Sequence, residues 1–219
     1  MELYRDDCLS KLKNFADKSI DITFTSPPYN RKRNDKYTNY DDTIKDYYLF
    51  LVETTDLLLA KTKRHVIINL QTNYYNRQDV YKFIGHYYNK IQNVIVWEKS
   101  NPLPANGHNI TNAFEYFFIL GDTAIKSNTT YTKNHITTSI NNNITKIHKA
   151  VMKQEVADWF IEKFTKENDV ILDCFMGLGT TGLSCIKYNR DFIGIELDEE
   201  YFNIAKERIE EANGIRGRI

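Results

Sequence analysis

The residues that most clearly suggest chemistry are two prolines directly after a short apolar strand, in the run Asp21-Ile-Thr-Phe-Thr-Ser-Pro-Pro-Tyr-Asn30. Each proline fixes φ and removes a backbone N–H, so Ser26 to Tyr29 should form a rigid turn that presents carbonyl oxygens. The Ser26 hydroxyl and the Pro27 carbonyl could accept both N–H groups of a planar exocyclic amine, and Tyr29 could stack on its ring. An isolated Pro-Pro pair more often only ends a strand, so both interpretations stay open.

A second candidate site lies in the glycine-rich run Asp169-Val-Ile-Leu-Asp-Cys-Phe-Met-Gly-Leu-Gly-Thr-Thr-Gly182. Its three glycines fit G-x-G-x-x-G between a strand that ends at Asp173 and a helix that should begin near Thr180. A helix N-terminus favours an anionic group. The next strand ends at Glu196, whose carboxylate could accept hydrogen bonds from both ribose hydroxyls of a nucleoside. This order of elements favours a nucleoside ligand over a purely structural turn.

These two sites must be positioned by a sheet, because short apolar runs alternate with segments of helical periodicity along the chain. This alternation predicts one α/β domain with a largely parallel sheet. Strands are expected at Leu3–Tyr4, Ile20–Phe24, Val66–Asn69, Val94–Trp97, Tyr116–Leu120, Val170–Asp173 and Phe192–Ile195, and helices at Tyr48–Leu59, Val80–Tyr87, Val156–Phe164 and Tyr201–Ile209.

One segment breaks the alternation, because Thr and Asn supply 12 of the 27 residues from Gly121 to Ile147. It is predicted to be a long polar loop, and loops of more than about 15 residues are usually functional or disordered. The single domain thus divides into residues 1–120, the loop at 121–147, and residues 148–219.

Charge is balanced, with 29 basic and 29 acidic residues, yet its distribution is uneven. Five lysines and no acid occur from Thr123 to Lys153, and Arg31, Lys32, Arg33 and Lys36 surround only Asp35. The second group also alternates with Tyr29, Tyr37 and Tyr40, a mixture that suits a polynucleotide, although an ordinary solvated loop is the alternative.

The cysteines and the distribution of apolar residues indicate whether a metal site is expected and in which compartment the protein is located. The three cysteines lack Cys-x-x-Cys spacing, and His148 has no second ligand nearby, so no metal site and no disulfide framework are expected. The first ten residues have no apolar core, and no run of 18 apolar residues occurs. We therefore expect a cytoplasmic protein with reduced thiols.

Taken together, these motifs resemble one family. Thr25-Ser-Pro-Pro-Tyr29 resembles the catalytic motif of DNA amino-methyltransferases, and Leu172 to Thr181 is similar to their S-adenosylmethionine motif. The order, with the catalytic motif first, resembles the beta class. Further matches are Asp7-Cys8, Val96-Trp-Glu-Lys-Ser-Asn-Pro102, Glu115, His148-Lys-Ala150 and Arg190-Asp-Phe-Ile-Gly-Ile-Glu196, so the resemblance spans nearly the whole chain.

The resemblance implies a Rossmann-like methyltransferase fold with a mostly parallel, seven-stranded sheet, helices on both sides and motifs in permuted order. It implies S-adenosylmethionine as cofactor and double-stranded DNA as partner. The implied catalytic residues are Ser26, Pro27, Pro28 and Tyr29; those for the cofactor are Asp7, Cys8, Lys149, Asp173, Phe175, Gly177, Gly179, Thr180, Thr181 and Glu196; and those for DNA are Asn30, Arg31, Lys32, Arg33, Lys126, Lys133 and Lys146. Departures from the family pattern are Leu178 for Ser, and Cys174, Lys149 and Lys153 for Pro.

The activity expected from the resemblance is methyl transfer to the exocyclic amine of a base flipped out of the duplex, which costs a few kcal/mol. In the family, Ser before Pro-Pro goes more often with cytosine N4 than with adenine N6, so cytosine N4 is favoured. The loop at 121–147 becomes the candidate for DNA recognition, and a homodimer and a cognate restriction endonuclease become possible partners. Two rivals remain open: an NAD-dependent oxidoreductase, and a nucleic-acid-binding module without catalysis.

Overall fold

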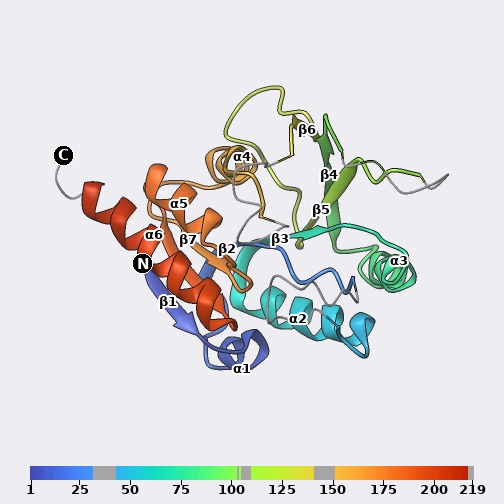
Figure 1. Ribbon diagram of the computed structural model, residues 1–219, viewed down its shortest axis with the longest axis horizontal. Helices are drawn as coiled ribbons and strands as arrows, with labels where there is room; N and C mark the ends of the chain where they lie inside the picture. The colour runs from blue at the N-terminus through green and yellow to red at the C-terminus, as the bar shows by residue number, and fades with distance from the viewer. Residues whose placement is uncertain (32–42, 103, 105–109, 141–150, 217–219) are drawn as a thin grey trace.

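The computed structural model describes residues 1–31, 43–102, 104, 110–140 and 151–216, and within them one sheet of eight strands forms the centre (Figure 1). Its spatial order is β1-β8-β7-β2-β3-β5-β4-β6. The strands are β1 (Glu2–Arg5), β2 (Ile20–Thr25), β3 (Thr62–Leu70), β4 (Ile91–Lys99), β5 (Phe114–Leu120), β6 (His135–Thr138), β7 (Val170–Asp173) and β8 (Asp191–Glu196).

The sheet is mixed, because β5 runs antiparallel to both of its neighbours, β3 and β4, while every other pair is parallel. From β7 the chain continues outward to β8, and from the adjacent β2 it continues in the other direction to β3. The carboxyl ends of β7 and β2 therefore flank a topological switch point, which is where open α/β sheets bind ligands.

Helices cover both faces of the sheet, with α1, α2 and α3 on one side and α4, α5 and α6 on the other (Figure 1). Helices α1 and α2 begin at aspartate caps: Asp7 accepts from the Ser10 N–H, and Asp46 accepts from the Leu49 N–H. The bounds are α1 (Cys8–Lys13), α2 (Tyr47–Lys61), α3 (Arg77–His86), α4 (Gln154–Phe164), α5 (Thr180–Lys187) and α6 (Glu199–Arg216).

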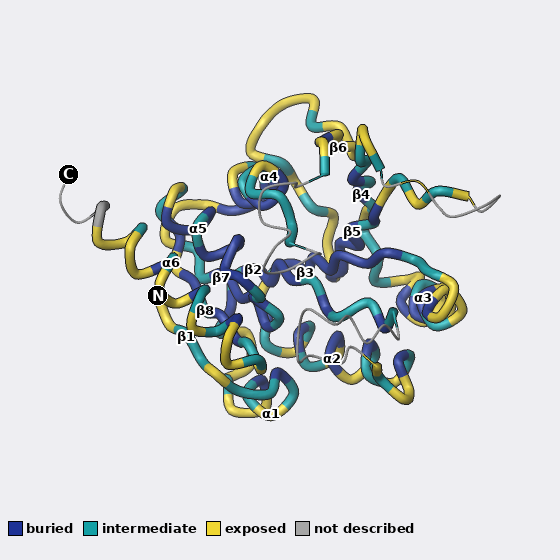
Figure 2. Tube along the Cα trace, viewed as in Figure 1, coloured by how far each residue is buried: buried dark blue, intermediate teal, exposed yellow. Residues whose placement is uncertain are grey.

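The central strands are buried on both faces because successive side chains enter different cores. In β5, Phe117 and Ile119 pack with α4, α5 and α6, while Phe118 and Leu120 pack with the first three helices. Figure 2 shows the central strands as the most continuously buried part of the chain. This double burial explains why these strands appear in the sequence as unbroken apolar runs.

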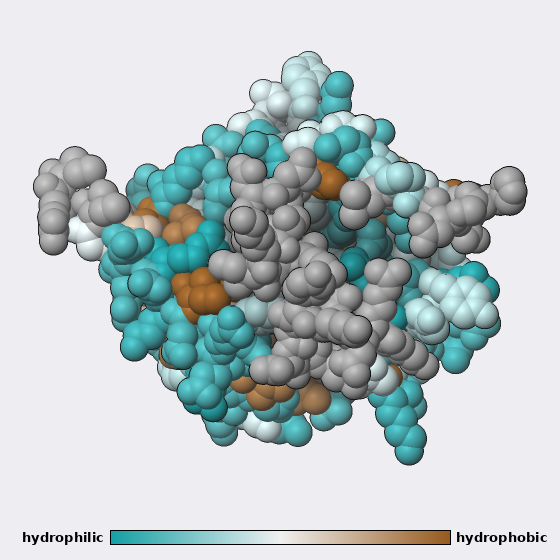
Figure 3. All heavy atoms as spheres, viewed as in Figure 1, coloured by the Kyte–Doolittle hydropathy of each residue, from teal (hydrophilic) through white to brown (hydrophobic). Residues whose placement is uncertain are grey.

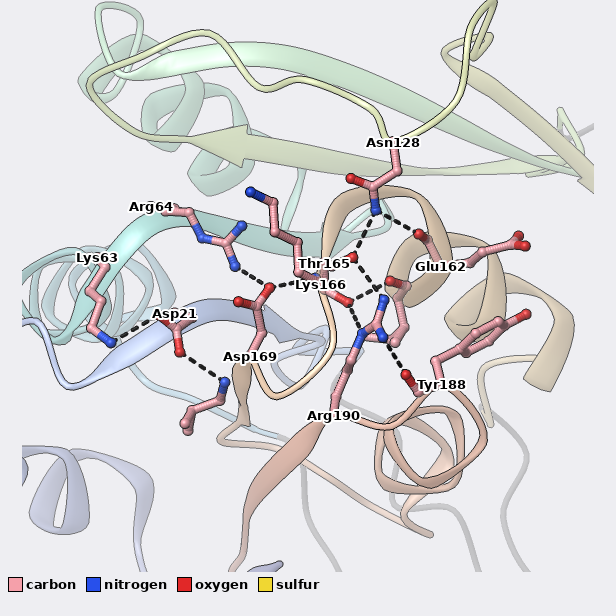
Figure 4. A network of polar contacts seen from close by, with 12 residues as sticks. Asp21, Lys63, Arg64, Asn128, Glu162, Thr165, Lys166, Asp169, Tyr188 and Arg190 are labelled. Carbon is pink, nitrogen blue, oxygen red and sulfur yellow. Dashed lines mark hydrogen bonds and ion pairs between the residues drawn. The ribbon is translucent and has the colours of Figure 1, made fainter.

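A polar network ties the segment after β5 to the amino ends of the strands (Figure 4). The amide of Asn128 donates to the Thr165 carbonyl at 2.7 Å and to the Glu162 carbonyl at 2.9 Å, at the end of α4. The Arg190 guanidinium donates to the same Thr165 carbonyl, and Arg64 of β3 pairs with Asp169 just before β7. Residues around Asn128 are thus held at the edge of the sheet opposite to the carboxyl ends of β2 and β7.

All seven expected strands are present, and the Rossmann-like fold is confirmed. The sheet has one strand more than predicted, because His135–Thr138 forms β6 beside β4 within the segment that the sequence indicated to be a loop. Its two buried residues, Ile136 and Thr138, include only one apolar side chain, so the apolar pattern was too short to detect. The short helix α1 was likewise not predicted. No helix in the described part of the chain is long and apolar enough to cross a membrane.

Candidate active site

The two predicted motifs meet at the switch point, although they lie more than 140 residues apart. Strand β2 pairs with β7 through Ile22 and Ile171 and through Thr23 and Leu172. Beyond this pairing, the Thr25 hydroxyl donates to Asp173 Oδ1 at 2.8 Å. The Ser26–Tyr29 turn and the glycine loop therefore leave the sheet side by side.

The Ser26 hydroxyl is oriented by Asn69, near the carboxyl end of β3. Ser26 Oγ donates to Asn69 Oδ1 at 3.1 Å, and Asn69 Nδ2 donates to the Tyr116 carbonyl at 3.1 Å. The second bond fixes the amide so that its oxygen faces Ser26. Because the serine proton points toward Asn69, oxygen lone pairs remain to accept an N–H from a ligand.

Tyr29 is anchored through its hydroxyl. Tyr29 Oη lies 2.8 Å from Glu115 Oε2, 3.1 Å from Ser26 Oγ and 2.5 Å from Asn69 Oδ1. Burial, and the nearby Glu115 carboxylate, raise the pKa of Tyr29 well above its ordinary value, so the hydroxyl stays protonated. A ring fixed at its far end is pre-organised for stacking.

The backbone of the turn is held from the segment after β3. Asn73 Nδ2 and Asn76 Nδ2 both donate to the Tyr29 carbonyl, at 2.9 and 2.8 Å. The Arg31 guanidinium lies 5.4 Å from the Tyr29 ring centroid and donates to Gln71 Oε1 at 2.6 Å. Sequence reasoning missed Asn69, Gln71, Asn73 and Asn76; the available signal was a polar run at the carboxyl end of a buried strand.

Asn30 has an internal role and is not at the surface, where it was expected. It is 3% exposed, it adopts a left-handed backbone conformation at φ 49°, and its amide exchanges hydrogen bonds with the backbone of Ile44. Its side chain therefore joins the two ends of the segment that starts after Arg31, and it is not available to DNA in this conformation.

The glycines of the second motif have different roles. Gly177 has φ +51°, and a Cβ added there would meet no atom within 4 Å, so its backbone borders open space. A Cβ on Gly179 or Gly182 would lie 3.0 or 2.6 Å from Ile209 Cδ1 of α6. Only Gly177 thus leaves room for a ligand, while Gly179, at φ +78°, and Gly182 allow the turn and the helices to pack closely.

Glu196 ends β8 and faces this loop. Its Oε2 accepts the Gly177 N–H and its Oε1 accepts the Asp198 N–H, both at 2.9 Å. Burial raises the pKa of Glu196, and these backbone N–H groups oppose the increase. Each carboxylate oxygen accepts a backbone N–H and has capacity for a further bond, as two ribose hydroxyls require. The Asp6 N–H also donates to the Glu196 carbonyl, which places the start of α1 beside this site.

Asp173 is occupied by the protein itself. Its carboxylate accepts from Thr25, from the Thr181 hydroxyl at 2.6 Å and from the Phe175 N–H at 3.2 Å. Burial raises the pKa of Asp173, and these donors oppose the increase. Asp173 and Thr181 therefore join the two motifs, and the half-buried Phe175, with Gly177, is the part of the loop open to a ligand.

The remaining predicted residues fall into three groups. Cys8 and Thr180 are buried, and Asp7 caps α1. Lys126 and Lys133 are exposed, and Lys126 lies two residues from Asn128 near the opposite edge of the sheet. Lys32, Arg33, Lys146 and Lys149 lie outside the described residues.

Comparisons with known proteins identify the family. A family model for N6/N4 DNA methylases matches residues 20–207. The chain is 27% identical to the type II methyltransferase M.HinfI of Haemophilus influenzae, covering 95% of this chain and 68% of that protein. It is 30% identical to M.MwoI of Methanothermobacter wolfeii over 92% of this chain but only 34% of that protein.

Solved structures with a similar fold include the PvuII DNA methyltransferase and M1.HpyAVI. The cytosine-N4-specific PvuII enzyme superimposes with a TM-score of 0.76 at 20% identity, covering 97% of this chain and 90% of the other. The M1.HpyAVI complex with S-adenosylmethionine superimposes with a TM-score of 0.70 at 25% identity, covering 95% of this chain and 98% of the other.

Proposed function

Because the chain belongs to the N6/N4 family of DNA methylases, we propose that it uses the Ser26–Tyr29 turn to bind the exocyclic amine of a flipped DNA base. The observation that carries this proposal is the 2.8 Å hydrogen bond between Thr25 and Asp173, which places that turn beside the glycine loop. A methyl donor on one motif and an acceptor amine on the other would then be neighbours, and proximity of this kind accounts for much of enzymatic rate enhancement.

The residues of the second motif fit S-adenosylmethionine, the cofactor of this family. Gly177 leaves open space where a side chain would stand, and the oxygens of Glu196 can accept the ribose hydroxyls. Phe175 offers a half-buried ring to the adenine. When bound, this cofactor supplies a methyl group activated by a positively charged sulfur.

At the catalytic turn, the Ser26 hydroxyl and the Pro27 carbonyl accept the two N–H groups of the amine. These bonds hold the amine so that its lone pair faces the methyl donor, and the Tyr29 ring stacks on the base from its anchored position. The chain therefore contributes orientation and hydrogen bonding and needs no strongly basic group.

Transfer of a labelled methyl group to duplex DNA tests this function. Incorporation of label that depends on Ser26 and on S-adenosylmethionine is expected. Calorimetric titration with S-adenosylmethionine and with NAD separates the methyltransferase from the oxidoreductase rival. Retained DNA binding without any transfer of label would favour the binding module instead.

For the base, we propose cytosine N4 over adenine N6. The support is Ser26 before Pro-Pro, a neutral hydroxyl whose proton is directed to Asn69. Both amines present the same local group, so the turn itself would serve either base. Digestion of methylated DNA to nucleosides and mass spectrometry distinguishes the products, and N6-methyladenine as sole product would refute the cytosine assignment alone.

For partners, we propose duplex DNA approaching the edge that carries Arg31. On the face that Figure 3 shows, the described surface is mostly hydrophilic, with small and separate apolar patches. A homodimer, a cognate restriction endonuclease and a cytoplasmic location stay predictions. Sedimentation analysis with and without duplex DNA measures the oligomeric state.

A further inference from the structure

A single hydroxyl group, that of Tyr29, separates a buried carboxylate from the amine-binding oxygen of Ser26. Glu115, in β5, is 5% exposed, and its Oε2 lies 2.8 Å from Tyr29 Oη. Tyr29 Oη in turn lies 3.1 Å from Ser26 Oγ. A continuous line of hydrogen-bonding oxygens therefore leads from the catalytic turn to an acidic side chain inside the fold.

The donor and acceptor capacity of each group determines the direction in which a proton can move between Ser26 and Glu115. Asn69 Oδ1 contacts both hydroxyls but can only accept a hydrogen bond, and the Asn69 Nδ2 amide donates to the Tyr116 carbonyl. Only the hydroxyls of Ser26 and Tyr29 can both accept a proton and pass one on. The Glu115 carboxylate is the one group at the end of the line that can keep it.

Resting on the proposed function, we infer that Glu115 is a positioning residue for methyl transfer, which polarises Ser26 through Tyr29 and receives the proton that the amine releases. As the N–CH3 bond forms and the S–CH3 bond breaks, an amine proton moves to Ser26 Oγ. The Ser26 hydroxyl turns from Asn69 Oδ1 to Tyr29 Oη, 3.1 Å away, and passes its proton there, and the tyrosine proton moves to Glu115 Oε2. Both hydroxyls end neutral, and the positive charge lost from sulfur is balanced by the charge lost from Glu115.

Before any proton moves, the same line strengthens Ser26 as an acceptor. Tyr29 donates to Glu115, and a Ser26 hydroxyl that turns from Asn69 to donate to Tyr29 carries more negative charge on its own oxygen, because chains of hydrogen bonds polarise one another. Lys99 of β4 contacts Glu115 Oε1 and supplies the opposite charge, which lowers the cost of burying this carboxylate.

Two substitutions that preserve shape test the inference. Glu115→Gln removes the charge, and its new amide N–H would donate to Tyr29 Oη and reverse the line. Tyr29→Phe keeps the ring for stacking and removes only the hydroxyl. The matched controls are Glu53→Gln on α2 and Tyr81→Phe on α3. Both residues are exposed and belong to helices that do not contribute to the Ser26–Tyr29–Glu115 line.

The measurement is single-turnover methylation of duplex DNA at saturating S-adenosylmethionine, with the dissociation constants of cofactor and DNA determined separately. Both variants should bind within about twofold of wild type yet transfer methyl about tenfold more slowly or worse. The double variant should be no slower than the slower single variant, because both act through one line. The controls should match wild type.

A rate within twofold of wild type in Tyr29→Phe, or losses that multiply in the double variant, would overturn the inference. If thermal denaturation shows that Glu115→Gln is unfolded, the methylation rate of Tyr29→Phe alone tests the inference. A wild-type protein that transfers no methyl group contradicts the proposed function instead, so the two failures are distinguishable.

Discussion

Removal of the Glu196 side chain is the sharpest test of the cofactor site. In Glu196→Ala the backbone N–H groups of Gly177 and Asp198 lose their acceptors. Gly177 borders open space, so water can satisfy it, and the protein should keep its fold. The expected damage therefore falls on the ligand and not on stability.

The magnitude follows from the bonds that the ligand would lose. Hydrogen bonds to a charged group contribute about 1.5–3 kcal/mol each, and water compensates part of the loss at a carboxylate that is only partly buried. We expect a net weakening of about 2–3 kcal/mol, which is about 30- to 140-fold in Kd. Glu196→Gln keeps one acceptor oxygen and should fall between wild type and the alanine variant.

The pH dependence of cofactor binding provides a second measure. Burial raises the pKa of Glu196, and a protonated carboxyl group accepts ribose hydroxyls less well. Cofactor affinity should therefore be full at neutral pH and should fall on acidification through that raised pKa, before an ordinary glutamate would titrate. In the alanine variant this dependence should disappear.

Calorimetric titration of S-adenosylmethionine into wild type and variants is the assay, with Glu200→Ala at an exposed position of α6 as control. DNA affinity should stay nearly unchanged in every variant. An unchanged cofactor Kd in Glu196→Ala, or an equal loss in Glu200→Ala, would remove Glu196 from the site.

Three further variants test the catalytic turn, its link to the cofactor loop, and the DNA surface. Tyr29→Ala should cost about 1–3 kcal/mol of base stacking and lower turnover more than cofactor affinity, in single-turnover and calorimetric assays; unimpaired turnover would place the base elsewhere. Thr25→Val should lower the free energy of unfolding in urea by about 1–3 kcal/mol, because buried Asp173 loses a donor; an unchanged midpoint would contradict that. Arg31→Gln should reduce the salt slope of DNA binding by about 1, while Lys126→Gln at the opposite edge should leave it unchanged; the reverse result would move DNA to the 121–134 segment.

The sequence predicted those strands and helices that are determined by the residues within them. The apolar runs of β2, β3, β5 and β7 are buried on both faces, so their composition alone distinguishes them. By contrast, β6 is an edge strand of four residues whose pairing with β4 depends on tertiary contacts. A sheet edge of this kind leaves little pattern in the sequence.

Within the site, the sequence identified the motifs but not the contacts between distant residues. Asn73 and Asn76 act on the Tyr29 carbonyl, 44 and 47 residues away, and no local pattern specifies that contact. Asn30 has a residue type suited to DNA contacts, yet its bonds to Ile44 place it in the interior.

The Asp173 carboxylate explains how two motifs so far apart can act as one site. It accepts from Thr25 on the catalytic side and from Thr181 and the Phe175 N–H on the cofactor side. Neither turn can move away without leaving a buried polar group unpaired, which costs about 1–3 kcal/mol. Because β2 and β7 are neighbours in the sheet, this coupling depends on spatial order alone, so the order of the motifs along the chain does not affect the site.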